Sequence, residues 1–256
     1  MFKPPEPGQY FPLATFFLAT LMVLVFLLTS TNSDYYSSLL GFVPASPQLY
    51  TLFSYLFIHA NLEHIFFNLI FLVIAGYVIE QTIGKAIFLS IFFASGNIAV
   101  LFDIAGRFLT GISFSVPFVG ASGAIFGLLA VAALLRPFAT MPTLIALIAF
   151  IPLLQFLIFT PPPELAATGL ADYFLILGIF GAFALSIAFM PFSIPIFLAL
   201  IFFLINWIII IALRFPEQVS NIGHLGGMLG GLLSFFIIAS SKRKPKAKPE
   251  RFRIKI

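Results

Sequence analysis

Three short stretches of an otherwise apolar chain carry polar side chains that could do chemistry. His64 and Asn68 are four residues apart, so on a helix they share one face. Ser122 lies in a Gly-x-Ser-Gly string, and His224 lies in a later stretch that is rich in glycine. A serine hydroxyl becomes a competent nucleophile when a nearby histidine accepts its proton, and amide or imidazole donors can stabilise the resulting oxyanion. Together these residue types would support transfer of an acyl group to water.

Each stretch also has an interpretation without catalysis. The glycines around Ser122 and after His224 are typical of close helix packing in lipid. His59 and Asn61 are polar residues that water or neighbouring helices could satisfy at a membrane interface. A glycine face does not explain the imidazole of His224, however, and the deeper amide of Asn68 needs hydrogen bonds inside the protein. The catalytic interpretation is therefore favoured where the serine and the two histidine stretches meet.

The composition predicts a membrane protein. Of the 256 residues, 61% are hydrophobic and only 9% are charged, whereas soluble domains are about 45–50% apolar. So few charges cannot solvate a globular surface, which excludes a soluble enzyme. The absence of cysteine excludes a disulfide scaffold and a thiol nucleophile. No metal-ligand spacing and no phosphate-binding loop is present, so no metal, no cofactor and no nucleic-acid partner is expected.

Runs of about 20 apolar residues predict eight transmembrane helices. They lie near residues 11–30, 52–79, 86–105, 119–136, 142–160, 171–190, 194–213 and 222–240. The fifth and sixth runs are the least regular, because Pro152 interrupts one of them, and this pair could be re-entrant. The chain is thus predicted to be a transmembrane domain over residues 1–240 with a basic tail over residues 241–256.

Lysine and arginine predict the orientation, since these residues collect on the cytoplasmic side of short loops. With eight spans and both termini in the cytoplasm, only Arg107 and Arg214 of the 13 basic residues lie outside. Three complete spans separate Ser122 from His224, so their helices run in the same direction from the outer side. The helix that carries His64 and Asn68 also starts at the outer side. The three stretches can therefore converge at one depth near the outer surface.

The chain resembles the rhomboid intramembrane serine proteases. That family carries H-x4-H-x3-N on one helix, G-x-S-G on a second and H-x2-G-x3-G on a third. In this chain the three motifs occur in the same order as His59/His64/Asn68, Gly120/Ser122/Gly123 and His224/Gly227/Gly231. The likeness extends through Gly76, Glu80 and Gly84, and it covers roughly residues 45–136 and 194–240.

The resemblance implies an all-α polytopic fold with a rhomboid-like six-helix core, to which residues 142–190 would add two further spans. It implies that Ser122 is the nucleophile and His224 its base in a dyad. The oxyanion hole would be formed by Asn68, His64 and the backbone N–H of Ser122. Structural residues near the site would be His59, Gly120, Gly123, Phe126, Gly227 and Gly231.

Two departures from the family pattern concern the surroundings of the site. Many members have Trp-Arg in the first outer loop, where this chain has Tyr50-Thr51. The residue four after the nucleophile is often Tyr, and here it is Phe126, which could still stack on the base but has no hydroxyl. No carboxylate is well placed as a third catalytic member, so a dyad is expected.

The expected substrates are single-pass transmembrane proteins, met in the lipid bilayer of the cell membrane. The active site would lie near the outer side and the C-terminal tail in the cytoplasm. Two alternatives stay open. The chain could be a rhomboid-like protein that binds membrane partners without cleaving them, or a transporter in which His64, Asn68 and His224 line a polar path.

Overall fold

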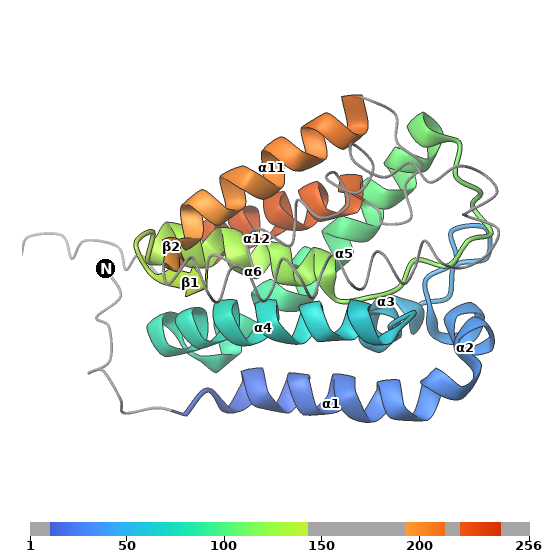
Figure 1. The fold of residues 1–256 in the computed structure, drawn as a ribbon, viewed down its shortest axis with the longest axis horizontal. Coiled ribbons are helices and arrows are strands. Elements are labelled where there is room, and N and C mark those ends of the chain that lie inside the picture. Colours follow the sequence, from blue (N-terminus) through green and yellow to red (C-terminus); the bar gives the residue numbers. More distant parts are fainter. Residues whose placement is uncertain (1–10, 143–192, 213–220, 242–256) are drawn as a thin grey trace, which may run out of the picture.

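The structure is a computed structural model that describes residues 11–142, 193–212 and 221–241. These ranges are mostly helical (Figure 1). The helices are α1 (Leu13–Thr29), α2 (Ser33–Leu40), α3 (Thr51–Ser54), α4 (Leu62–Ile83), α5 (Lys85–Thr110), α6 (Ser122–Leu135), α11 (Ile196–Ala212) and α12 (Asn221–Ser241). Short 3-10 turns lie at Ser30–Asn32 and Tyr55–Phe57, and two strands are present, β1 (Thr140–Pro142) and β2 (Ser193–Pro195).

The predicted polytopic membrane class is confirmed by the lengths of the apolar helices. Four helical segments are long and apolar enough to cross a membrane: Leu13–Leu40, Leu62–Ile83, Lys85–Thr110 and Asn221–Ser241. The apolar helices α6 and α11 correspond to the predicted fourth and seventh spans. The predicted spans at 142–160 and 171–190 lie outside the described residues. The number of spans and the side of each terminus therefore stay predictions.

The second predicted span begins ten residues later than residue 52, because its first part forms separate short turns. The chain is extended at Ile58, and α4 starts only at Leu62. The break is stabilised by Asn61, whose side chain accepts a hydrogen bond from the backbone N–H of His64 at 2.8 Å. This is an N-cap, which satisfies a donor that the first helical turn leaves unpaired.

One short strand pair departs from the predicted all-α fold. Strands β1 and β2 pair antiparallel, so that Thr140 lies opposite Pro195. Next to this pair, the backbone N–H of Ile196 donates to the carbonyl of Ala139 at 2.9 Å. The pairing ties the end of α6 to the start of α11 (Figure 1). Three-residue strands have too little hydrophobic periodicity to be predicted from sequence.

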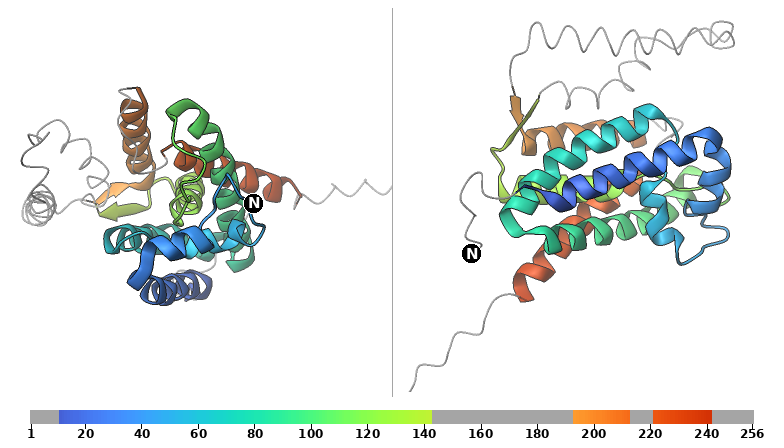
Figure 2. Two further views of the ribbon diagram at one scale, coloured as in Figure 1. Left: turned by 90° about the vertical axis from the view of Figure 1, so that its right-hand side faces the viewer. Right: turned by 90° about the horizontal axis from the view of Figure 1, so that it is seen from below.

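Helix α6 is the central helix of the described bundle. It contacts α4, α5, α11 and α12, and the left view of Figure 2 shows it surrounded by these helices. Every residue from Gly123 to Ala132 is buried. A helix that is apolar on all sides can be buried on all sides, which is why α6 occupies the interior. Its first residue is Ser122, so the candidate nucleophile starts the central helix.

The opposite end of α4 is joined to the start of α1. The Glu80 carboxylate accepts hydrogen bonds from the backbone N–H groups of Ala14 and Thr15 and from the Thr15 hydroxyl, at 2.9 to 3.0 Å. A carboxylate suits this place because the first N–H groups of a helix lack acceptors and carry partial positive charge. Gly76 leaves room for Thr15, since a Cβ at Gly76 would lie 2.5 Å from the Thr15 hydroxyl oxygen.

Candidate active site

The structure brings Ser122 and His224 into hydrogen-bond contact. The Nε2 atom of His224 lies 2.7 Å from the Oγ atom of Ser122, although the two residues are 102 positions apart. Ser122 is half-buried at the start of α6, and His224 is buried in the first turns of α12. A hydroxyl within this distance of an imidazole nitrogen can donate its proton to that nitrogen. The geometry therefore suits a serine activated by a histidine base.

Glycines bring the two helices close enough for this contact. A Cβ at Gly227 would collide with the backbone of Gly123, and a Cβ at Gly231 would collide with the backbone of Gly127. The backbones of α6 and α12 are thus in direct contact over two turns, without intervening side chains. Small residues at four-residue spacing allow this approach. Gly123, Gly227 and Gly231, to which the resemblance assigns a structural role near the site, thus lie at the contact between α6 and α12.

Phe126 packs on the candidate base. Its ring centroid lies 4.9 Å from that of His224, with the planes inclined at 47°. Phe126 is one helical turn after Ser122, so α6 presents the hydroxyl and the ring on one side. Phe126 also contacts Phe203 of α11 with a centroid distance of 5.0 Å, and Phe203 contacts Phe71 of α4 at 5.5 Å. The candidate base is thus held against an aromatic cluster that reaches α4 and α11.

The imidazole of His64 lies against the loop that leads into Ser122. A Cβ at Gly120 would lie 2.5 Å from both Cε1 and Nε2 of His64. Gly120 also has a φ of 103°, a conformation that other residues rarely adopt. Its N–H donates to the carbonyl of Tyr55 at 2.9 Å, which fixes the loop from the other side. Gly120 therefore meets two requirements, close approach and positive φ, that only glycine can meet together.

Asn68 is buried on α4, one turn after His64. Its Nδ2 atom donates to the backbone carbonyl of His64 at 2.7 Å. A side-chain amide nitrogen carries two hydrogens, so this bond leaves one available to a further acceptor. Only 4% of the Asn68 surface is exposed, as expected for a deep amide that bonds within the protein. The structure thus brings His64 and Asn68 to the same helical face, as their spacing predicted.

His59 lies before α4 begins and contacts His64 rather than the serine. Its ring is 5.0 Å from that of His64 in an edge-on arrangement, and its Nδ1 lies 3.2 Å from the carbonyl of Phe57. Burial lowers the pKa of the His59 imidazole to about 3, because desolvation disfavours the charged form. A neutral ring with Nδ1–H donating to the Phe57 carbonyl holds the extended turn before α4.

The start of α6 presents free backbone donors beside the serine. The first backbone hydrogen bond of this helix runs from the N–H of Ile125 to the carbonyl of Ala121. The N–H groups of Ser122, Gly123 and Ala124 consequently have no acceptor within the helix. They point out of the helix end that carries partial positive charge. A negative oxygen that develops next to Ser122 would meet these donors.

The serine is recessed below the end of the neighbouring helix. Gly123 packs against Ala99 of α5, and α5 continues for a further eleven residues to Thr110. At 1.5 Å per residue that is about 16 Å of helix beyond the level of the serine. The loop of residues 111–121 must therefore return into the bundle before α6 starts. Ser122 lies within the bundle rather than at its edge.

An ion pair near the end of α5 has no counterpart among the predicted site residues. Arg107 Nε lies 2.6 Å from Asp103 Oδ2, and both residues are 4% exposed. The Arg107 Nη1 atom donates to the backbone carbonyls of Ser113 and Val116 in the loop before α6. Opposite charges four residues apart inside an apolar run were a signal in the sequence. In the sequence, Arg107 was a signal only for the orientation of the chain in the membrane.

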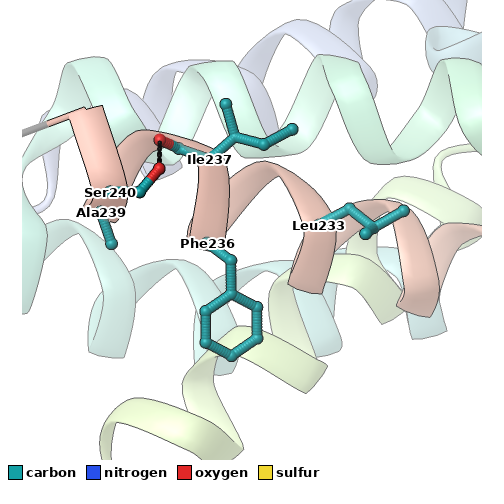
Figure 3. Close-up of a pocket in the computed structure, with 5 residues that line it drawn as sticks. All are labelled: Leu233, Phe236, Ile237, Ala239 and Ser240. Atoms are coloured by element: carbon teal, nitrogen blue, oxygen red, sulfur yellow. Dashed lines mark hydrogen bonds between the residues drawn. The ribbon is translucent and has the colours of Figure 1, made fainter.

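A separate pocket lies on α12, away from these residues. It is lined by Leu233, Phe236, Ile237, Ala239 and Ser240 (Figure 3). Ser240 is the one polar side chain in this lining, and its hydroxyl already donates a hydrogen bond to the carbonyl of Ile237 at 2.8 Å. The lining begins nine residues after His224, about 14 Å along the helix. This shallow apolar surface has no part in the candidate active site.

The apolar helices and the recessed Ser122–His224 pair define a multi-pass membrane protein with a serine and a histidine in contact inside its helical bundle. A family model described as the rhomboid domain matches residues 46–162. This match supports a rhomboid family protein. The matched range contains His59, His64, Asn68 and Ser122 and ends before His224. A search of curated proteins gives no significant match.

Proposed function

We propose that this protein is an intramembrane serine endopeptidase that uses Ser122 and His224 as a catalytic dyad. The observation that carries the proposal is the 2.7 Å contact between His224 Nε2 and Ser122 Oγ at the recessed start of the central helix. The match to the rhomboid domain supports it, since rhomboid proteins are generally intramembrane serine proteases, although some members are inactive. A serine and a histidine placed only for packing would have no reason to be joined in this way by two glycine-rich helices.

In the proposed reaction, Ser122 Oγ attacks the carbonyl carbon of a substrate peptide while His224 Nε2 takes the hydroxyl proton. The tetrahedral intermediate collapses, the C–N bond breaks, and the proton on Nε2 passes to the leaving nitrogen. An acyl ester on Ser122 and a new amine remain. A water molecule then attacks the ester, with His224 accepting its proton and returning that proton to Oγ. The products are a carboxylate and the free enzyme.

We propose that three donors stabilise the negative oxygen of each intermediate. The backbone N–H of Ser122 is available because the helix supplies no acceptor for it. His64 lies against Gly120, two residues before the serine, and Asn68 lies one turn further along α4. Donors fixed before the reaction stabilise the transition state without reorganisation, and losing one such donor typically costs about a hundredfold in rate. We therefore assign these three groups to the oxyanion hole.

The proposed substrates are single-pass membrane proteins that enter from the lipid bilayer. A transmembrane helix has its carbonyls in hydrogen bonds, so the segment to be cut must unwind before Ser122 can attack. Small and helix-weakening residues near the cut are therefore expected. We place the site near the outer side of the cell membrane and the C-terminal tail in the cytoplasm, because basic residues collect in the tail.

Cleavage of a model single-pass substrate in liposomes tests this proposal. The wild type, Ser122→Ala and His224→Ala are compared, and Ser234→Ala serves as a matched serine control on α12. The Ser234 hydroxyl donates to the carbonyl of Gly230, a contact with no link to the dyad. We expect cleavage by the wild type and the control and none by the dyad variants. Cleavage that survives in Ser122→Ala would refute the proposed protease, whereas flux of ions or solutes would support a transporter.

A further inference from the structure

The loop of residues 111–121 decides where Ser122 lies, and contacts along its length hold this loop. Backbone hydrogen bonds join Phe42 to Phe118 at 2.8 and 2.9 Å and Ala45 to the carbonyl of Phe114 at 2.9 Å, and the N–H of Gly120 donates to Tyr55. In the first half of the loop, the carbonyls of Ser113 and Val116 both accept from the same atom, Arg107 Nη1. One side chain of α5 thus holds two points of the loop that delivers the candidate nucleophile.

Arg107 is suited to this task by its shape. The guanidinium is planar and presents its donors in a fixed fork, so Asp103 can orient it through Nε while Nη1 points at the loop. Both side chains are buried, and a buried ion pair generally stabilises a protein no more than apolar residues of similar volume would. The pair is therefore better explained by the geometry it imposes than by stability alone.

The same turn of α5 also touches the helix that carries the base. Gly106 precedes Arg107, and a Cβ at Gly106 would lie 2.9 Å from Cδ1 of Ile222. Ile222 is two residues before His224 at the start of α12. One turn of α5 therefore contacts the loop before Ser122 through Arg107 and the start of α12 through Gly106. A shift of this turn would change the distance between the two residues of the dyad.

We propose that Arg107, oriented by Asp103, is a positioning residue that holds Ser122 and its backbone N–H in register with His224. This inference rests on the proposed protease function. Arg107 donates to the loop and has no contact with the Ser122–His224 pair among the interactions described, so it acts through the loop backbone. Its loss should slow the chemical step and leave substrate binding largely intact, because a displacement of about 1 Å in a catalytic group can cost about a hundredfold in rate.

Two variants separate positioning from folding. Arg107→Lys keeps the buried positive charge but removes the fork that reaches Asp103 and both carbonyls. The double variant Asp103→Leu with Arg107→Met removes both charges together, which avoids leaving one buried charge unpaired. Thr15→Val is the control, since it loses a part-buried hydrogen bond to Glu80 where α1 meets α4 and leaves the loop unchanged. All are assayed in liposomes for kcat, KM and Tm, with hydrogen exchange of the loop amides.

We expect both Arg107 variants to lose about a hundredfold in kcat with KM nearly unchanged, and the amides of residues 113–121 to exchange faster. Thr15→Val should lower Tm and leave kcat and the loop amides as in the wild type. Wild-type kcat in the Arg107 variants, or a loss that matches the folded fraction as in the control, would overturn the positioning role alone. A wild type that cleaves nothing would instead overturn the proposed function, and this inference with it.

Discussion

Replacing Gly227 by alanine should separate the two residues of the proposed dyad. The added Cβ would lie 2.6 Å from the carbonyl carbon of Gly123, about 1 Å closer than carbon atoms pack in van der Waals contact. Backbone on both sides leaves no flexible side chain to move away, so α12 must shift from α6. A shift of about 1 Å would stretch the 2.7 Å contact between His224 and Ser122 beyond hydrogen-bond distance.

The expected loss in kcat is about a hundredfold, equivalent to about 2.7 kcal/mol of transition-state stabilisation. The assay is the steady-state cleavage rate in liposomes, with Tm measured on the same samples. Gly230→Ala is the matched control on α12, because its Cβ would meet Ile98 and Ser95 of α5 rather than α6. Overpacking should cost each variant about 1–3 kcal/mol of stability. Equal kcat in the two variants at equal folded fraction would refute the glycine argument.

Three further predictions follow from other contacts. Phe126→Leu should lower kcat about tenfold by removing the ring from His224, while Phe126→Tyr keeps the ring and should stay near the wild-type kcat. Glu80→Gln should lower stability by about 1–3 kcal/mol in a thermal melt, with kcat unchanged well below Tm, because the carboxylate serves α1 and not the site. If α11 moves aside for substrate entry, a cross-link between α4 and α11 should block cleavage of membrane substrates. The chain has no cysteine of its own, so the pair Phe71→Cys and Phe203→Cys can form this cross-link. Small reagents that label the serine should still react. Unimpaired cleavage by the cross-linked protein would remove that gating role.

Much of the site could be predicted because membrane helices follow simple rules of length and direction. The predicted odd number of spans between Ser122 and His224 requires their helices to run the same way, and the contact between the first turns of α6 and α12 has that arrangement. Glycine at four-residue spacing predicts close approach of backbones, which the contact of Gly227 with Gly123 shows. The four-residue spacing of His64 and Asn68 predicts a shared face. These features depend on local periodicity, and the sequence displays local periodicity directly.

Other features depend on contacts that periodicity does not contain. The break before α4 arises because Asn61 caps the helix, and a cap inside an apolar run is easily missed when the run is counted as one span. The hold of Arg107 on the loop depends on the path of residues 111–121, which no repeat pattern specifies. The hydrogen bond from Asn68 to the carbonyl of His64 depends on a rotamer choice. Tertiary contacts decide each of these features.

The most direct test of the central claim is covalent labelling of the wild type in liposomes with a fluorophosphonate, followed by peptide mass spectrometry. The reagent reacts with a serine whose hydroxyl is activated by a base, so the dyad predicts a single adduct on Ser122. His224→Ala should abolish the adduct while the protein stays folded, because the base that lies 2.7 Å from Oγ is gone. A folded wild type that carries no adduct on Ser122, or an adduct that persists in His224→Ala, would contradict the account.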